Sequence, residues 1–265
     1  MNNNHDKQNT NAKNAGRTLL IIIAILLIIC GSIQFGYYLY SRYTADIDNP
    51  NPIETTVPDT EAEEKLVNNP IDFDELQAAN DEIYAWIRVP GTKIDHPIVQ
   101  SKTDDRFYLN HSAYTKEYLV SGAIFTQSMN STGFDDRVTV IYGHNTANEK
   151  MFNTLHKFEN TEFFNKHKKF YIYTPDSRLT YTIVSAFKYD NRHIMNSFDF
   201  QDNQVFADFV EMVKNPTSSN KNVRKDIDKT VTNYDNIVVL STCIYRQASS
   251  RLLVCGVLTN NEKTN

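Results

Sequence analysis

One stretch of this chain is so apolar that it limits what the N-terminal part can become. Residues 19–30 read LLIIIAILLIIC, and the run continues less purely to Tyr40, with Gln34 as the one strongly polar side chain inside it. A helix over residues 19–40 would be about 33 Å long, against roughly 30 Å of bilayer hydrocarbon. Tyr37, Tyr38 and Tyr40 lie at its far end, where an interfacial aromatic belt is expected. The run therefore predicts a single transmembrane helix.

Two other interpretations of this run remain open. A cleaved signal peptide also combines a basic start with a short apolar core, and a buried core helix is the second alternative. A signal peptide ends in a small-residue site of the A-x-A kind, whereas the residues that follow Cys30 are GSIQFGYY. The sequence therefore favours an uncleaved anchor over residues 19–40.

The charges on the two sides of the run are unequal. Residues 1–18 carry a net charge of +2, from Lys7, Lys13 and Arg17 against Asp6. Residues 41–65 carry a net charge of −5, from two bases against seven acids. Because basic segments stay on the cytoplasmic side, residues 1–18 are predicted to form a cytoplasmic tip. The rest of the chain is then extracellular, held at the cell membrane by a single span.

The segment after the run does not look like packed structure. Residues 41–70 contain four prolines among acids, Asn and Thr, and few large apolar residues. This composition favours an extended stalk, with an acidic binding tail as the alternative. Residues 71–265 remain, and they are long enough for one well-buried domain.

Strand-like patterns dominate residues 71–265. Runs of β-branched and aromatic residues between turn signals predict eight strands, at residues 84–89, 93–99, 122–127, 137–143, 169–173, 178–188, 237–243 and 251–259. Helices are predicted at residues 72–80, 104–110, 149–156, 161–167 and, as the longest, 201–214. Because most links between strands are short, a mostly β barrel or sandwich with peripheral helices fits better than an alternating βαβ fold.

The charge composition argues against one class of function, nucleic-acid binding. The chain has 27 Lys and Arg against 32 Asp and Glu, a net charge of −5, which gives no support to a nucleic-acid binder. The basic residues between 214 and 229 are interleaved with acids, which favours a solvated face over a binding patch. The sequence shows no evident metal site and no cofactor motif.

Three cysteines are too few for a disulfide scaffold. Cys30 falls in the apolar run. Cys243 and Cys255 fall in two strands predicted to be joined by a seven-residue loop, residues 244–250, which places Cys243 opposite Arg251. Cys255 is then about 13 Å further along the strand, beyond the roughly 7 Å that a disulfide allows between Cα atoms. Cys255 is therefore predicted to be a core residue with a free thiol.

Cys243 occupies a more suggestive position, because it ends a strand and faces an arginine. Strand-end positions often carry catalytic residues on a rigid scaffold. A nucleophilic cysteine needs a neighbouring base or cation, and a donor for the developing oxyanion. Arg251 can supply both charge and hydrogen bonds, although a buried, inert thiol remains the alternative. Arg246 is the rival arginine.

Among the seven histidines, His144 alone has a context that suggests catalysis. It follows the run RVTVIYG and precedes Asn145, so it ends another predicted strand. Such a position can bring it beside Cys243 across a sheet. His5 is predicted to be cytoplasmic, and the other histidines are interpreted as structural or exposed: His96, His111, His156, His167 and His193.

These segments together resemble the sortases, the cysteine transpeptidases of Gram-positive surfaces. The residues that carry the resemblance are YGHN at 142–145, VLSTC at 239–243 and Arg251. The family's cysteine motif is usually T-L-x-T-C, so Val239 is a mild departure. A helix ahead of the first strand and a helix-containing insert between the sixth and seventh strands resemble the class B branch.

The resemblance implies an eight-stranded sortase-type β-barrel with a groove at one end. It implies that Cys243 attacks the carbonyl of a Thr in a cell-wall sorting signal and forms a thioacyl-enzyme. His144 would protonate the leaving amine and deprotonate the incoming one, and Arg251 would hold the substrate and the oxyanion. No acid near the cysteine is evident to orient His144. Implied partners are surface proteins with a sorting signal, the amine of a peptidoglycan precursor or cross-bridge, and the membrane.

Substrate contacts are predicted at three further residues. Ser241 lies two residues before Cys243 on the same strand face and could hydrogen-bond the peptide, or it could be an ordinary strand serine. His193 and Ile194, in the connection after the sixth strand, resemble a substrate-lining segment of class B enzymes. Two other functions remain open, a secreted cysteine hydrolase and an anchored, non-enzymatic binding barrel.

Overall fold

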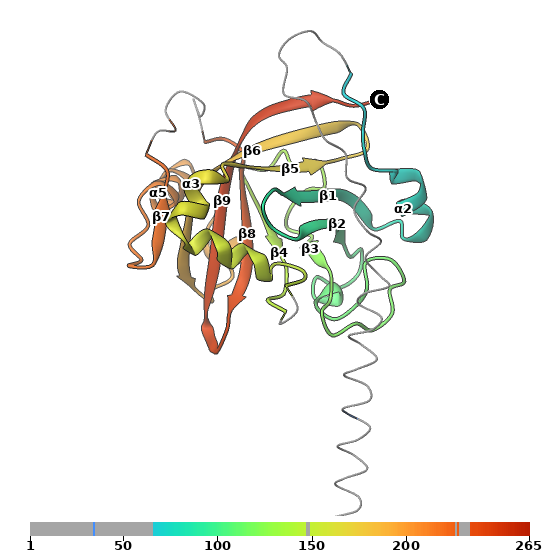
Figure 1. The fold of residues 1–265 in the computed structure, drawn as a ribbon, viewed down its shortest axis with the longest axis horizontal. Coiled ribbons are helices and arrows are strands. Elements are labelled where there is room, and N and C mark those ends of the chain that lie inside the picture. The colour runs from blue at the N-terminus through green and yellow to red at the C-terminus, as the bar shows by residue number, and fades with distance from the viewer. Residues whose placement is uncertain (1–33, 35–65, 147–148, 226, 228–233) are drawn as a thin grey trace, which may run out of the picture. The chain divides into compact units, whose positions relative to one another are not determined.

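The computed structural model describes residue 34 and residues 66–265, apart from residues 147–148, 226 and 228–233 (Figure 1). Its elements from residue 66 onward belong to one compact unit, Asn51–Asn265. The predicted span at 19–40 lies outside the described residues except for Gln34. Within the described part of the chain, no helix has both the length and the apolar character needed to cross a bilayer.

Eight strands close into a barrel, as the sequence predicted. Their order around the barrel is β5-β1-β2-β3-β4-β8-β9-β6, and β6 pairs back with β5 (Figure 1). Their bounds are β1 Ile83–Val89, β2 Ile94–Gln100, β3 Ile124–Thr126, β4 Val138–Tyr142, β5 Lys169–Tyr173, β6 Ser177–Asp190, β8 Ile237–Ile244 and β9 Gln247–Lys263. The pairs β2–β3 and β4–β8 are parallel, and the other pairs are antiparallel.

Side chains alternate between the inside and the outside of the barrel wall, because successive Cβ atoms of a strand point to opposite faces. In β8, Val238 and Leu240 pack into the cluster that fills the barrel. Ile237 and Val239 instead pack into a second cluster outside the wall, which includes Phe209 of α5. The odd-numbered positions of β8 therefore lie on the outer face.

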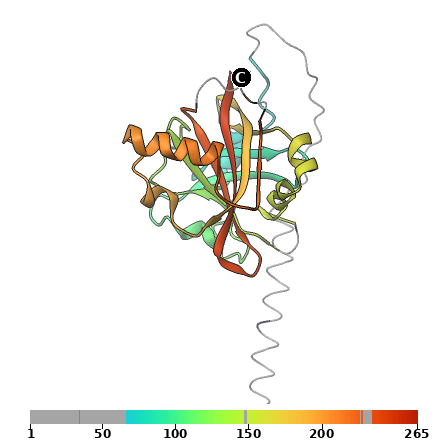
Figure 2. The same ribbon diagram turned by 90° about the vertical axis from the view of Figure 1, so that its left-hand side faces the viewer.

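Among the described residues, five short helical segments and one longer helix lie around the barrel. Asp72 caps α2, Phe73–Ala79, by accepting from the backbone N–H of Glu75. The predicted helices at 161–167 and 201–214 correspond to α3, Thr161–Lys166, and α5, Asn203–Lys214, which lies beside the barrel in Figure 2. The other two predicted helices are short 3₁₀ segments, η1 at Phe107–Leu109 and η2 at Asn153–Glu159.

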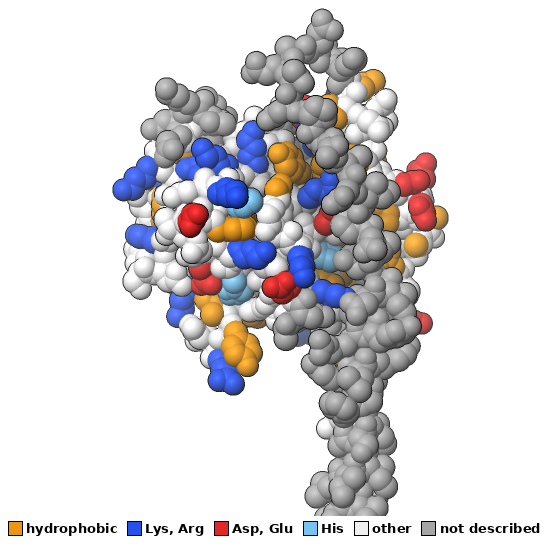
Figure 3. All heavy atoms as spheres, viewed as in Figure 1, with side chains coloured by type: hydrophobic (Ala, Val, Ile, Leu, Met, Phe, Trp, Pro, Cys, Tyr) orange, Lys and Arg blue, Asp and Glu red, His pale blue; other side chains and the backbone are white. Residues whose placement is uncertain are grey.

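Two elements were not predicted. Helix α4, Ile194–Ser197, is a single turn capped by the side chain of His193, and it is too short to show helical periodicity. Strand β7, Lys221–Val223, pairs with β6 and extends the sheet, and it lies among the basic residues between 214 and 229. Figure 3 shows basic side chains scattered over one face of the described residues, with acidic ones between them.

The predicted seven-residue loop at 244–250 is wrong. Strand β8 runs to Ile244 and β9 starts at Gln247, so the reversal takes only Tyr245 and Arg246. Arg246 adopts the left-handed conformation with a φ of 56°, which permits this tight turn. Strand β6 continues to Asp190 and pairs with Ser250, which gives the start of β9 a second neighbour. The predicted pairing of Cys243 with Arg251 is confirmed.

Candidate active site

A cavity of about 280 Å³ opens on the outer face of the barrel wall. Residues of β3, β4, β8 and β9 line it, together with the segments around residues 106–109 and 189–194, the second of which includes the end of β6. All six residues that the sequence predicted as catalytic or substrate-binding line this cavity: His144, His193, Ile194, Ser241, Cys243 and Arg251. The fold therefore brings together residues from four separate parts of the chain.

Cys243 lies at the exposed end of β8 and has a free thiol. The odd-numbered positions of β8 face outward, so Cys243 and Ser241 line the cavity from the same face. Between them, Thr242 is buried and donates to the Gly143 carbonyl oxygen at 2.8 Å. This bond joins the ends of β8 and β4, so the cysteine and histidine segments are held beside each other.

Gly143 allows the chain to make this approach. A Cβ at this position would lie 2.6 Å from Cγ of Phe152, a ring that is fully buried. No other residue therefore fits between the end of β4 and the barrel core, and the chain turns from β4 into His144 at this point.

His144 is oriented by the main chain rather than by an acid. Its Nε2 lies 2.6 Å from the carbonyl oxygen of Leu109, at the end of η1. A carbonyl oxygen can only accept, so Nε2 carries a proton and Nδ1 is the nitrogen whose protonation can change. The sequence could not reveal this partner, because every residue carries a backbone carbonyl.

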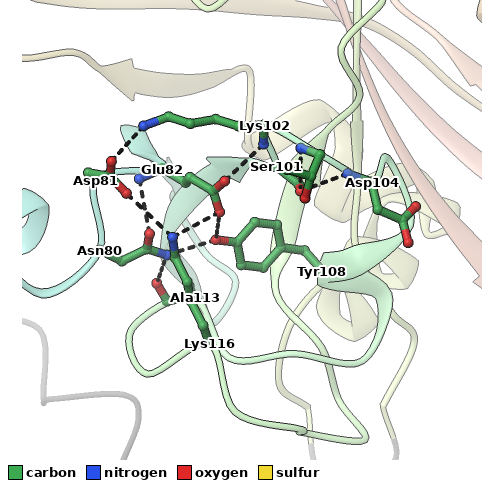
Figure 4. A network of polar contacts seen from close by, with 10 residues as sticks. Asn80, Asp81, Glu82, Ser101, Lys102, Asp104, Tyr108, Ala113 and Lys116 are labelled. Carbon is green, nitrogen blue, oxygen red and sulfur yellow. Dashed lines mark hydrogen bonds and ion pairs between the residues drawn. The ribbon is translucent and has the colours of Figure 1, made fainter.

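The segment that holds Leu109 is itself anchored by a polar network (Figure 4). Tyr108 donates to the Glu82 carboxylate at 2.5 Å and accepts from the Asn80 amide at 2.8 Å. Asn80 also donates to the Ala113 carbonyl oxygen at 2.6 Å, and Lys116 lies 3.2 Å from the Glu82 carboxylate. These contacts tie the 101–116 segment to the start of β1 and so support the carbonyl that holds His144.

Arg251 lies across the hairpin from Cys243 and is half-buried. Its Nη1 donates to the carbonyl oxygens of Ala248 and Ser250, at 3.1 and 3.0 Å. Nε and Nη2 remain for a bound group, because a guanidinium carries five N–H donors. The rival Arg246 does not line the cavity, and its guanidinium lies over the ring of Tyr245 at the exposed turn.

The remaining predicted residues, His193 and Ile194, also line the cavity. The His193 Nε2 lies 2.6 Å from Oε1 of Gln127, and its Nδ1 accepts the backbone N–H of Asn196 at the start of α4. Ile194 is buried beside it. Tyr142 is stacked on Phe125 at the cavity wall, and burial raises its pKa to about 12, so it stays neutral. Arg106 and Arg192 also line the cavity and were not singled out in the sequence.

Known protein families include one that matches most of this domain. A family model described as the Sortase domain matches residues 87–259.

The chain belongs to the sortase family.

The relatives are class B sortases, which confirms the branch that the sequence resembled. Sortase B of Staphylococcus aureus is 27% identical over 243 residues, covering 90% of this chain and 96% of that protein. Sortase B of Listeria monocytogenes is 31% identical over 169 residues, covering 64% of this chain and 65% of that protein. The matched segment thus spans just under two thirds of the Listeria relative. A crystal structure of Clostridium perfringens sortase B superposes with a TM-score of 0.63 at 31% identity, covering 71% of this chain and all of that one (100%).

Sortases are cysteine transpeptidases, so family membership identifies the class of chemistry to which the cavity belongs. The described residues contain no cluster of three or more His, Cys, Asp or Glu side chains arranged to hold a metal ion. One thiol, one imidazole and one guanidinium line this cavity, and the imidazole and the guanidinium are held by hydrogen bonds to main-chain carbonyls.

Proposed function

We propose that this protein is a sortase B-type transpeptidase that cleaves a C-terminal sorting signal after Thr and transfers the surface protein to a peptidoglycan amine. The observation that carries the proposal is the convergence of Cys243, His144 and Arg251 on one cavity, in a chain of the sortase family. The amine belongs to a peptidoglycan precursor or cross-bridge.

In the first half-reaction, the Cys243 thiolate attacks the Thr carbonyl carbon. A C–S bond forms, and the carbonyl oxygen carries the negative charge until the C–N bond breaks. In this step the N–H groups at Nε and Nη2 of Arg251 donate to that oxygen, because preorganised donors stabilise a developing charge most effectively. His144 gives a proton to the leaving amine, and the product is a thioacyl-enzyme.

In the second half-reaction, the acceptor amine attacks the thioester. His144 takes a proton from the attacking nitrogen, a new amide bond forms, and Cys243 leaves as the thiolate. The Leu109 carbonyl holds Nε2 throughout, so Nδ1 is the nitrogen that carries each proton. The enzyme returns to its starting state with no net change in its protons.

Three residues are proposed to contact the sorting signal. Ser241 is buried on the cavity floor beside Cys243 and can hydrogen-bond the peptide backbone. Ile194 presents an apolar side chain, and His193 is held by Gln127 in a fixed orientation. This mixture of polar and apolar groups suits a short peptide bound in one direction.

The domain arrangement and location are also part of the proposal. Residues 1–18 form a cytoplasmic tip, 19–40 a transmembrane anchor, 41–70 an extracellular stalk and 71–265 the catalytic domain. The apolar run and the charges on either side of it support this arrangement. Protease added to intact cells should digest the chain beyond Tyr40, and complete protection would overturn the orientation.

The activity is tested by incubating the full-length chain with a library of Thr-containing sorting-signal peptides, with and without an amine acceptor. A transpeptidase gives a ligated product that depends on the amine. Peptide release to water, without any ligated product, would identify a cysteine hydrolase instead. If Cys243→Ala, His144→Ala and Arg251→Ala all left the protein's function unchanged, the barrel would be a binding module with an inert thiol.

A further inference from the structure

A second histidine lies behind Cys243, outside every motif that the sequence analysis used for catalysis. His156 belongs to η2, and its Nε2 is 3.1 Å from the carbonyl oxygen of Cys243. Its Nδ1 is 2.8 Å from the carboxylate of Glu159, one turn further along the same segment. The side chains of His156 and Glu159 are 23% and 29% exposed, so water screens the pair only in part. The sequence analysis interpreted His156 as structural or exposed.

Asn145 connects this pair to the histidine segment of the cavity. Its amide nitrogen lies 2.9 Å from the Cys243 carbonyl oxygen and 3.1 Å from Nε2 of His156. Asn153 in turn donates to the Asn145 side-chain oxygen at 2.5 Å, which fixes the orientation of the amide. Asn145 directly follows His144 in the chain, so one side chain joins the backbones of both proposed catalytic residues.

The Cys243 carbonyl is a useful group to hold. A peptide unit is planar, so fixing its C=O also fixes the direction of the N–H of Ile244 on the opposite side. Holding this carbonyl also limits rotation about the Cα–C bond of Cys243, and therefore limits the positions that the thiol can adopt. At the exposed end of a strand, where β8 is about to reverse at Tyr245 and Arg246, the ladder alone provides less restraint.

The contacts are consistent with two protonation states of His156. When the ring is neutral, Nδ1–H donates to Glu159 and Nε2 accepts one amide hydrogen of Asn145, while the other amide hydrogen bonds the Cys243 carbonyl. When the ring is protonated, Nε2–H donates to that carbonyl directly. Protonation therefore adds a donor and a positive charge beside Cys243.

The surroundings favour the protonated ring. Burial by itself lowers the pKa of His156, but the bonds to Glu159 and to the Cys243 carbonyl outweigh it and raise this pKa above its usual value. The hydrogen bond from His156 lowers the pKa of Glu159, so the carboxylate stays charged. Asn220 donates to the second Glu159 oxygen at 3.0 Å and holds it in place.

The other charged side chains on the elements packed against η2 are engaged elsewhere or exposed. The Lys221 ammonium of β7 donates to the Pro216 carbonyl, and the Lys188 ammonium of β6 donates to Gln247. Arg251 of β9 binds the carbonyls of its own hairpin. Glu162 and Lys166 of α3 are exposed to solvent. Glu159 is the charged group that determines the titration of His156.

We propose that His156, oriented by Glu159, is a positioning residue that holds the Cys243 peptide from behind and acts on the thiol through its own protonation. This inference rests on the proposed role of Cys243 as the nucleophile. His156 does not line the cavity, so it acts through the cysteine and not on the substrate.

The test uses the full-length chain and four variants. His156→Ala removes the contact, His156→Gln keeps an N–H that can reach the carbonyl but cannot be protonated, and Glu159→Gln keeps the shape but removes the charge. His167→Gln is the matched control, since that ring packs on Phe163 away from Cys243. Two quantities are measured: the rate of Cys243 alkylation by iodoacetamide from pH 5 to 9, by mass spectrometry of the Cys243 peptide, and kcat and KM for sorting-signal cleavage.

We expect His156→Ala to lower kcat about tenfold with KM changed less than about twofold, because the peptide-binding wall is untouched. His156→Gln should recover most of that kcat, yet lose the His156 ionisation from the alkylation profile. In Glu159→Gln that ionisation should move to lower pH, because the carboxylate that favours the protonated ring is gone. His167→Gln should match the unmodified protein.

Unchanged alkylation profiles and kcat in the folded His156 variants would overturn the inference. If His156→Ala does not fold, the Gln variants at 156 and 159 decide the question, since each retains the hydrogen-bonding shape. The two proposals fail separately. If the unmodified chain cleaves the peptide and the variants cleave it equally well, the positioning role is wrong and the transpeptidase function stands. If the substitutions change the alkylation profile of Cys243 but the unmodified chain cleaves no peptide, the transpeptidase function is wrong and the positioning role stands.

Discussion

Cys243 and Cys255 lie on the two strands of one hairpin, and the structure gives them opposite surroundings. Cys243 is exposed at the end of β8, whereas Cys255 is fully buried in the middle of β9, opposite Val239. Burial raises the pKa of the Cys255 thiol to about 12, so it stays protonated. We therefore expect the two cysteines of this hairpin to differ in reactivity, because the barrel exposes one and buries the other.

The same contrast holds for the contacts around each thiol. Cys255 packs among apolar side chains between the barrel wall and α5, including Val184 and Phe209. The Cys243 carbonyl instead accepts from the Asn145 amide, and the neighbouring Thr242 and Arg251 donate to the main-chain carbonyls of Gly143 and Ser250. Cys243 itself stays exposed. The barrel wall should therefore determine stability and the end of the hairpin should determine activity.

The largest effect is expected from removing the exposed thiol. Cys243→Ala should lower transpeptidation by at least about 10³-fold, because Cys243 has the one thiol among the residues that line the cavity. Its free energy of unfolding should change by less than about 0.5 kcal/mol, since the side chain is exposed. Peptide cleavage and denaturant unfolding of the same preparation check both. Comparable cleavage by the variant would show that Cys243 is not the nucleophile.

Arg251 should come next. Arg251→Lys keeps a positive charge but loses the planar fork of donors, and we expect a loss of about 10²-fold in kcat. The matched control is Arg246→Lys in the same hairpin, at the exposed turn, which should retain full activity. Steady-state kinetics of the two variants compare the arginines directly, and equal losses in both would reassign the role.

Cys255 should show the reverse behaviour. Cys255→Ala leaves a small cavity in the cluster outside the barrel wall, which should cost about 1–2 kcal/mol of stability. The kcat of the folded protein should stay within about twofold of the unmodified value. Urea unfolding and kinetics below the transition measure the two quantities. If activity fell by more than the fraction of folded protein, the packing around Cys255 would also influence the cavity at Cys243.

The smallest effect concerns the network that supports the Leu109 carbonyl. Hydrogen bonds from Tyr108, the Lys102 backbone and Lys116 outweigh burial and lower the pKa of Glu82. Its stabilising contribution is therefore present above the unfolded pKa of about 4.3 and is lost as the pH falls through the lower folded pKa. Glu82→Gln should cost about 0.5 kcal/mol at pH 7 and nothing near pH 2.

Thermal unfolding of Glu82→Gln and the unmodified chain at several pH values tests this. A stability difference that does not shrink on acidification would show that the Glu82 charge is not the cause. A kcat that falls along with stability at pH 7 would show that the network reaches His144 through Leu109.

Much of the barrel could be predicted because its signals are local. Alternating β-branched and aromatic residues marked all eight barrel strands, and the position of Arg251 opposite Cys243 followed from simple strand geometry. The missed elements were short. Helix α4 and strand β7 have too few residues to show a period. The tight turn needs Arg246 in the left-handed conformation, which an arginine in the sequence does not indicate.

The site was predictable only where it depends on residue type. A thiol, an imidazole and a guanidinium at strand ends could be recognised, as could the placement of Ser241 on the face of Cys243. The role of the Leu109 carbonyl could not be recognised, because every residue has a main-chain carbonyl and the sequence does not show which one accepts a hydrogen bond. His156 was overlooked for a similar reason, since its partner is the carbonyl oxygen of Cys243 and not a side chain.

The sequence by itself determined the strand pattern, the family and the three groups that we propose carry the chemistry, because these follow from side-chain type and spacing. Only the tertiary structure decided which thiol is exposed, which nitrogen of His144 is held and which histidine stands behind the cysteine. These properties arise from contacts between segments that are distant in the chain, and a backbone carbonyl becomes specific only when the fold brings it beside a donor.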